Sequence, residues 1–256
     1  MAVMLEARRL GYGYPERPVG RALELALAAG EVLCVLGPNG GGKTTLFRTL
    51  LGLLPAQEGE VLVQGSPLEA LARAEIARRI GYVPQGSGAP FAYTVHEHVL
   101  MGRTAHIGLF AAPGRADRDA ADRAIEALGI GALSARVLTE LSGGERQLAM
   151  IARALAQGAR ALVLDEPTAS LDFGNQVRVL RQLRRLAAEG YAIVFSTHDP
   201  GQAFLAASRV LLLAHGGVLR QGAPADVVTP ENLRAVYGVD VRIAAVDGAR
   251  ACLPVL

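Results

Sequence analysis

Residues 32–54, VLCVLGPNGGGKTTLFRTLLGLL, place a short apolar run, a glycine-rich turn and a helix-like segment one after another. Residues 37–44 fit the pattern G-x-x-x-x-G-K-[ST]. Glycines there let successive backbone N–H groups point inward at phosphate oxygens, and the N-terminus of the following helix adds positive charge. Lys43 is placed to reach the β- and γ-phosphates of a nucleotide, and the Thr44 hydroxyl is a hard oxygen ligand of the kind that Mg²⁺ prefers. A glycine-rich turn that binds nothing is the alternative, and the flanking strand and helix disfavour it.

Two further apolar runs, ALVLDEP at 161–167 and YAIVFSTH at 191–198, resemble strands buried on both faces of a mostly parallel sheet. Ligands of open α/β sheets bind beyond the carboxyl ends of the strands. Asp165, Glu166 and His198 should therefore lie beside the phosphate-binding loop. Asp165 can hold Mg²⁺ there through water, and Glu166 can orient or deprotonate an attacking water. Taken alone, an Asp-Glu pair is more often a solvated turn.

The rest of the chain adds a strand, a helical insertion and a C-terminal extension to this core. LELAL at 23–27 alternates as an antiparallel strand does, and helix-like segments fill residues 95–157. A Thr-Pro-Glu helix start and a strand-like RIAAV follow near the C-terminus. We expect an α/β fold: a P-loop NTPase core with a mostly parallel sheet, an N-terminal antiparallel β subdomain and an inserted helical subdomain. The expected domains are a nucleotide-binding domain at 1–224, with its helical subdomain inserted at about 86–158, and a C-terminal extension at 225–256 packing on the same domain.

Composition narrows the class of protein. The 256 residues are 51% hydrophobic, which is enough for a sizeable core, and no run approaches the roughly 18 to 20 apolar residues of a membrane span. The 26 Lys and Arg residues against 24 Asp and Glu disfavour a nucleic-acid partner. Glu6, Arg8 and Arg9 interrupt the N-terminus where a secretory signal would be apolar, so we expect a cytosolic chain. Cys34 and Cys252 suggest no disulfide framework.

A Ser-Gly-Gly segment adds the most specific motif. LSGGERQ at 141–147 lies just upstream of the strand that ends in the Asp-Glu pair. Together with the phosphate-binding loop, it makes the chain resemble the ATP-binding cassette family over essentially its whole length, to about residue 240. The resemblance implies ATP and Mg²⁺ as cofactors and a head-to-tail pairing with a second copy of the chain. In that pairing Ser142, Gly143 and Gly144 of one copy would cap the γ-phosphate held by the other.

The same resemblance assigns site residues. Glu166 and His198 would act on the attacking water and the γ-phosphate, and Gln85 in GYVPQ would sense the γ-phosphate and Mg²⁺. Tyr14 would stack on adenine, with Tyr12 as an alternative. The implied metal ligands are Thr44, Gln85 and Asp165. The implied nucleotide contacts are Tyr14, Gly37, Pro38, Asn39, Gly40, Gly41, Gly42, Lys43, Thr44, Thr45, Ser142, Gly143, Gly144 and Asp172, the last in a loop that would contact the partner copy.

Two positions depart from the family pattern. Gly41 stands where Ser or Ala is usual, and Glu145 stands where Gln is usual. Neither departure removes a required group. Glu145 adds a negative charge beside the Ser-Gly-Gly segment.

Softer similarities favour an importer. Residues 91–110, FAYTVHEHVLMGRTAHIGLF, look like a surface that grips a permease. VLMGR within them, DEPTASLDFGNQ at 165–176 and TPENLRAVYGV at 229–239 resemble importers of iron-siderophores, haem, cobalamin and, in some members, molybdate. This implies a peripheral subunit on the cytoplasmic face of the inner (plasma) membrane, bound to a permease dimer and indirectly to a substrate-binding protein.

Three alternatives stay open. A soluble ATPase of cofactor assembly would work without a permease, and an ATP-binding regulatory module would never turn over. The Glu166 and His198 side chains argue against the regulatory module. His96, His98 and His106 suggest a metal site only weakly, because helical residues two apart point to different faces.

Overall fold

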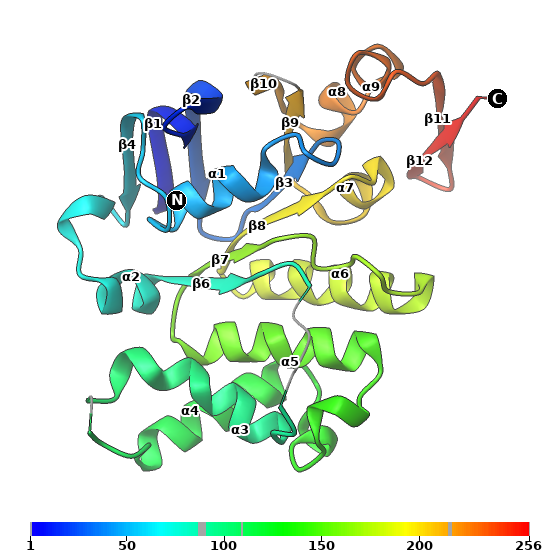
Figure 1. Cartoon of the computed structure of the whole chain (residues 1–256). Coiled ribbons are helices and arrows are strands. Elements are labelled where there is room, and N and C mark those ends of the chain that lie inside the picture. The colour runs from blue at the N-terminus through cyan, green and yellow to red at the C-terminus, as the bar shows by residue number, and fades with distance from the viewer. Residues whose placement is uncertain (1, 87–90, 109, 215–216, 256) are drawn as a thin grey trace.

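The central sheet contains the three buried strands that the sequence predicts. The computed structural model describes residues 2–86, 91–108, 110–214 and 217–255, and the sheet has the strand order β10-β9-β3-β8-β7-β6 (Figure 1). All neighbours pair in parallel except β10, which is antiparallel to β9. The strands are β3 (Val32–Leu36), β6 (Ile80–Val83), β7 (Ala161–Leu164), β8 (Ala192–Thr197), β9 (Arg209–Ala214) and β10 (Gly217–Gly222).

The register aligns the strand ends that carry the predicted site. Leu36 of β3 pairs with Thr197 of β8, and Leu164 of β7 pairs with Phe195 of β8. Parallel strands end at the same edge of a sheet. The residues that follow β3, β7 and β8 are therefore brought together at one edge.

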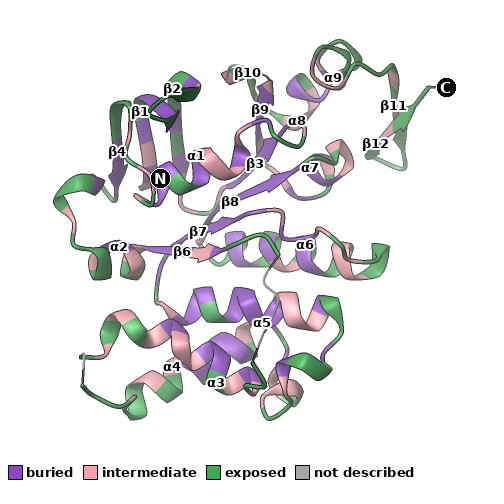
Figure 2. Cartoon of the chain, in the orientation of Figure 1, coloured by how far each residue is buried: buried purple, intermediate pink, exposed green. Residues whose placement is uncertain are grey.

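Alternate residues of the central strands face two different cores. Cys34 and Leu36 of β3 face a core shared with the helices α5 (Gly143–Ala156), α6 (Phe173–Ala188) and α7 (Pro200–Ala206). Leu33 and Val35 face a core shared with α1 (Lys43–Leu50) and the N-terminal sheet. Figure 2 shows the central strands buried and much of the outer helix surfaces exposed. Because both faces of the central sheet are covered, the sequences of these strands are continuous apolar runs.

The N-terminal sheet is antiparallel, as predicted. Its strand order is β2-β1-β4-β5. Leu23, Leu25 and Leu27 are buried and alternate with exposed neighbours, which confirms the predicted strand at 23–27. These leucines pack with Phe47 of α1 between the two sheets. The elements are β1 (Val3–Tyr14), β2 (Arg17–Ala28), α1 (Lys43–Leu50), β4 (Glu58–Val63) and β5 (Ser66–Pro67).

Helices fill the segment that the sequence marks as helical. The helices α3, α4 and α5 pack on one another below the central sheet in the view of Figure 1. Residues 87–90 and 109, which fall within the expected insertion and, for 109, within the expected permease surface, lie outside the described residues. The elements are η1 (Leu68–Ala70), α2 (Arg73–Arg79), α3 (Val95–Leu100), η2 (Met101–His106), α4 (Arg115–Ala127), η3 (Gly131–Leu133), η4 (Leu138–Glu140) and α5 (Gly143–Ala156).

The C-terminal segment packs beside the end of β8. It ends in an antiparallel hairpin whose second strand, β12, contacts α7. The sequence predicts one short helix with a Thr-Pro-Glu start, which corresponds to α9, and the strand β11, but not α8 or β12. None of the helices in the described ranges combines the length and apolar character that crossing a membrane requires. The elements are α6 (Phe173–Ala188), α7 (Pro200–Ala206), α8 (Pro224–Val227), α9 (Pro230–Tyr237), β11 (Val241–Val246) and β12 (Ala249–Pro254).

Candidate nucleotide site

The glycine-rich loop turns tightly between β3 and α1. Gly40 and Gly42 have φ values of 75° and 90°, in the left-handed region that glycine tolerates. A Cβ on Gly42 would lie 2.2 Å from Val19 Cγ1. Gly42 also occupies the N-cap position of α1, where no described side chain accepts from the helix N–H groups. The loop thus presents backbone N–H groups and a helix N-terminus, which together suit an anion.

Gly41, the first departure from the family pattern, fits the loop without a left-handed φ. Its N–H donates to the Pro38 carbonyl oxygen at 3.1 Å. A Cβ at this position would lie 3.0 Å from the same oxygen, so a larger residue would require a small adjustment of the loop.

Lys43 is the one lysine in the sequence, and its side chain is only 5% exposed. Its Nζ donates to the carbonyl oxygens of Gly37 and Pro38 at 2.9 and 3.0 Å. The same atom lies 3.2 Å from Glu166 Oε1. The loop therefore wraps around an ammonium group that pairs with Glu166, the second residue after β7.

Glu166 is the point at which four segments of the chain meet. Its Oε2 accepts from Gln85 Nε2 at 3.0 Å, and its Oε1 lies 3.6 Å from His198 Nδ1 and beside Lys43. Its φ of 46° is unusual for a residue with a side chain and fixes the direction in which the carboxylate leaves the strand. A carboxylate, an imidazole, an amide and an ammonium group thus share one small volume.

Ser196 in β8 supports both acidic residues, and the sequence analysis missed it. Its hydroxyl donates to Asp165 Oδ1 at 2.6 Å and accepts from the Glu166 N–H at 2.8 Å. The signal that could have revealed it is a hydroxyl directly after the apolar residues of a buried strand, because buried polar groups need partners.

The acidic and polar groups at this edge fit a divalent cation. Asp165 is 1% exposed, and its Oδ2 has no hydrogen-bond partner in the described part of the chain. An orphaned buried carboxylate oxygen is costly unless a cation or a donor meets it. Thr44 and Gln85, which line the adjoining cleft, add hard oxygen donors of the kind that suit Mg²⁺.

The histidines at 96, 98 and 106 have other partners. His98 Nε2 contacts Met150 Sδ at 3.0 Å, His96 Nε2 lies 3.3 Å from Asp122 Oδ1, and His106 Nε2 contacts the Gln157 carbonyl oxygen. Among the described residues no cluster of three or more His, Cys, Asp or Glu side chains could hold a metal ion.

A cleft of about 480 Å³ runs from the loop toward an aromatic side chain. Tyr14 lines it and is 41% exposed. Tyr12, the alternative, is 1% exposed, and burial raises the pKa of its phenol to about 12. Only Tyr14 of the two therefore offers a ring face to the cleft. The described lining is Tyr14, Arg17, Val19, Asn39, Gly40, Gly41, Gly42, Lys43, Thr44, Thr45, Gln85 and Glu166.

The Ser-Gly-Gly segment and Asp172 lie apart from this cleft. Ser142 is the N-cap of α5 and Asp172 is the N-cap of α6. Asp172 Oδ1 accepts from the Asn175 N–H at 2.9 Å. Neither Ser142, Gly143, Gly144 nor Asp172 is among the described residues that line the cleft. One chain alone does not bring all the predicted residues together.

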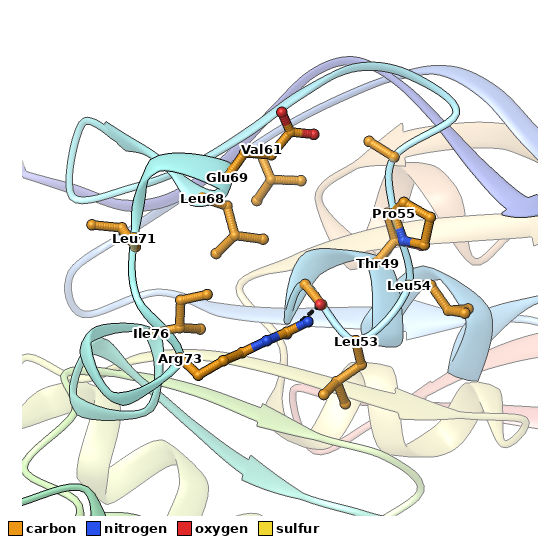
Figure 3. A pocket seen from close by; sticks show the side chains of 12 residues that line it. Thr49, Leu53, Leu54, Pro55, Val61, Leu68, Glu69, Leu71, Arg73 and Ile76 are labelled. Carbon is orange, nitrogen blue, oxygen red and sulfur yellow. Dashed lines mark hydrogen bonds between the residues drawn. The ribbon is translucent and has the colours of Figure 1, made fainter.

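A second hollow, of about 360 Å³, lies at the C-terminal end of α1 (Figure 3). Leu68, Leu71 and Ile76 form an apolar wall of this hollow. The Arg73 side chain also lines it, and its Nη1 donates to the Gly52 carbonyl oxygen. None of its described lining residues also lines the nucleotide cleft, so it takes no part in the site above.

Comparison with known proteins decides the family. A family model described as ABC transporter matches residues 21–169, more than half of the chain. The chain belongs to the ABC transporter family. This ABC ATPase is 38% identical to the ferric enterobactin transport ATP-binding protein of Escherichia coli K12, over 92% of this chain and 87% of the relative. It is 42% identical to the hemin import ATP-binding protein of Myxococcus xanthus, over 89% of this chain and 87% of the relative.

The fold has a close match among solved structures. A chain of a metal-chelate type ABC transporter in an inward-facing conformation superposes with a TM-score of 0.86 and 36% identity, covering 99% of this ABC ATPase and 98% of that chain. The predicted family and fold class are confirmed. The ATP-binding relatives identify an ATPase coupled to transport.

Proposed function

We propose that this ABC ATPase energises a membrane importer by binding and hydrolysing MgATP between two head-to-tail copies of itself. The observation that carries the proposal is the meeting of Lys43, Gln85, Glu166 and His198 at one sheet edge, beside the glycine loop. This set supplies a phosphate-binding cation, a carboxylate that can activate water and a donor for developing phosphate charge.

Each residue has a role in this proposal that its position supports. Backbone N–H groups of residues 37–45 and the Lys43 ammonium bind the phosphates, and Tyr14 stacks on adenine. Thr44, Gln85 and Asp165 hold Mg²⁺, which when bound neutralises phosphate charge. Lys43 leaves the Glu166 carboxylate when it turns to the phosphates. That carboxylate is then available to orient or deprotonate the attacking water.

The second copy completes the site. Ser142 and Gly143 are exposed at the start of α5 and Gly144 is buried there, and none of the three lines the cleft of its own chain. A closed two-fold pairing places this helix end, with Asp172 nearby, over the nucleotide of the partner copy. A single copy should accordingly hydrolyse ATP poorly.

A permease dimer is the proposed membrane partner, with a substrate-binding protein engaged indirectly at the other side. Phe91 and Tyr93 are exposed, and their ring centroids lie 5.8 Å apart. Exposed aromatic pairs are a common feature of protein interfaces. We place the ATPase on the cytoplasmic face of the inner membrane, attached through this segment.

The proposed cargo is a metal chelate such as an iron-siderophore, haem or cobalamin, with an oxyanion such as molybdate as the other class. Relatives named for ferric enterobactin and hemin, and a solved metal-chelate type transporter, support the chelate class.

We also propose the domain division that the sequence suggests. The nucleotide-binding domain spans 1–224 with the helical subdomain inserted at about 86–158, and the extension at 225–256 packs on it. Mutual packing of α3, α4 and α5 supports the insertion, and the contact between β12 and α7 supports the packing of the extension.

Purification of the ATPase from its native membrane in mild detergent, together with an ATPase assay, tests this function. Recovery of a polytopic permease and hydrolysis stimulated by a metal chelate would support it. Recovery of a soluble partner without a permease would contradict it and favour an assembly ATPase. A permease complex that binds ATP and never hydrolyses it would favour a regulatory module.

A further inference from the structure

The Glu145 carboxylate accepts a hydrogen bond from the Ser142 hydroxyl. The Ser142 hydroxyl donates to Glu145 Oε2 at 2.8 Å, and the Ser142 N–H donates to the same oxygen at 2.9 Å. In return, the Glu145 N–H donates to Ser142 Oγ at 3.3 Å. This is a reciprocal capping box at the start of α5.

The arrangement fixes which way the hydroxyl can donate. An ionised carboxylate only accepts hydrogen bonds, so the Ser142 hydrogen points back at Glu145. The hydroxyl then turns a lone pair, not a donor, toward anything approaching the helix end. Hydrogen bonds from the Ser142 N–H and hydroxyl lower the pKa of the Glu145 carboxyl, so this state persists at neutral pH.

We propose that Glu145 is a positioning residue that restrains Ser142 and thereby weakens ATP-driven pairing of two copies. The inference rests on the proposed head-to-tail dimer. To bind the γ-phosphate held by the partner copy, the Ser142 hydroxyl must turn its hydrogen from Glu145 to a phosphate oxygen. The released carboxylate then stays close to that phosphate, and the two negative charges repel each other.

Glu145→Gln changes this chemistry with almost no change of shape. The amide oxygen in the place of Oε2 still accepts from the Ser142 N–H and hydroxyl. Because this oxygen is neutral and a weaker acceptor than a carboxylate, it releases the hydroxyl hydrogen to a phosphate more easily, and the negative charge is gone. The variant should therefore pair more readily.

The chain contains a matched control at the start of α3. Thr94 and Glu97 form the same capping box, in which the Thr94 N–H and hydroxyl both donate to Glu97 Oε2 at 2.8 Å. Glu97→Gln makes the same chemical change on a helix end that takes no part in the nucleotide site. It should alter folding stability much as Glu145→Gln does and leave pairing unchanged.

The test measures the dimerisation Kd with ATP and Mg²⁺ by analytical ultracentrifugation, in a Glu166→Gln background that blocks hydrolysis. We expect Glu145→Gln to tighten pairing by at least about tenfold, because the dimer contains two of these sites and each hydroxyl is then released from a neutral acceptor instead of an ionised one. In a Ser142→Ala background the same change should tighten pairing less, because it relieves only the charge repulsion and no hydroxyl remains to be released.

The outcomes separate this inference from the dimer on which it rests. A parent protein and a Glu145→Gln variant that both stay monomeric with saturating ATP would remove the proposed dimer and with it the role of Glu145. A parent that pairs, with an unchanged Kd after Glu145→Gln, would overturn the inference alone. An equal effect in the Ser142→Ala background, or with Glu97→Gln, would also overturn it.

Discussion

Among single residues, Ser196 links the two acidic positions of the site. One buried hydroxyl satisfies both Asp165 Oδ1 and the Glu166 N–H. Ser196→Ala leaves both groups without that partner, which should cost about 1–3 kcal/mol of unfolding free energy. Because the two acidic residues also shift, we expect kcat to fall and the Mg²⁺ dependence to change in steady-state assays.

Ser208→Ala is the control for this prediction. The Ser208 hydroxyl also makes two hydrogen bonds: it accepts from the Val32 N–H and donates to the Val32 carbonyl oxygen, at the end of β3 that lies away from the site. Its loss should lower stability and leave kcat and the Mg²⁺ dependence as they are. Equal catalytic effects from both substitutions would show that Ser196 acts through stability alone.

Lys43→Ala tests nucleotide binding. Removal of the ammonium abolishes a charged hydrogen-bond donor to phosphate, so ATP affinity should fall by at least about tenfold in calorimetry. Because Lys43 is the one lysine of the sequence, an amine-reactive reagent has only this side chain and the terminal amine to modify. We also expect bound ATP to slow the reaction of Lys43 with this reagent. Unchanged ATP affinity in the variant would contradict the assigned role.

The contact between α3 and α5 makes the stability of the helical region depend on pH. His98 packs on Met150, and burial, with a smaller contribution from nearby Arg153, lowers the pKa of its imidazole from 6.5 to about 4. The unfolded chain therefore binds the proton first, and stability falls as pH drops from 6.5 toward 4. Denaturant midpoints over this range should show the loss, and His98→Leu should reduce it.

His96→Gln serves as the comparison, since His96 is partly exposed beside Asp122. The pH dependence should persist in that variant. A His98→Leu protein with the same pH dependence as the parent would contradict the assignment to His98.

Whole elements were predictable where the sequence carries a local signal. The apolar runs of β3, β7 and β8 end in a glycine loop, an Asp-Glu pair and a histidine, so the strands and the edge they share follow from sequence. The hairpin strand β12 could not be predicted from the sequence, because its residues are mostly exposed and show no clear apolar period. The hydrogen bonds of Ser196 depend on the pairing of β7 with β8, which joins residues some thirty positions apart. Glu145 is different, since its Ser-x-x-Glu spacing is a local signal that we did not use.

For the molecule as a whole, the predicted site residues fall into two groups that one copy of the chain does not bring together. The loop, Gln85, Asp165, Glu166 and His198 meet at one edge, while the Ser-Gly-Gly end of α5 faces elsewhere. The account joins them through a second copy, with ATP between the two. Closure on ATP and opening after hydrolysis would then be the motion that a permease senses.

Glu166→Gln tests this account most directly. The amide preserves the shape of the side chain and cannot take a proton from water, so ATP should bind and stay. Light scattering should show a monomer with ADP and a dimer with ATP and Mg²⁺, while Lys43→Ala combined with Glu166→Gln should remain monomeric in both. A Glu166→Gln protein that binds ATP to saturation and stays monomeric would contradict the account.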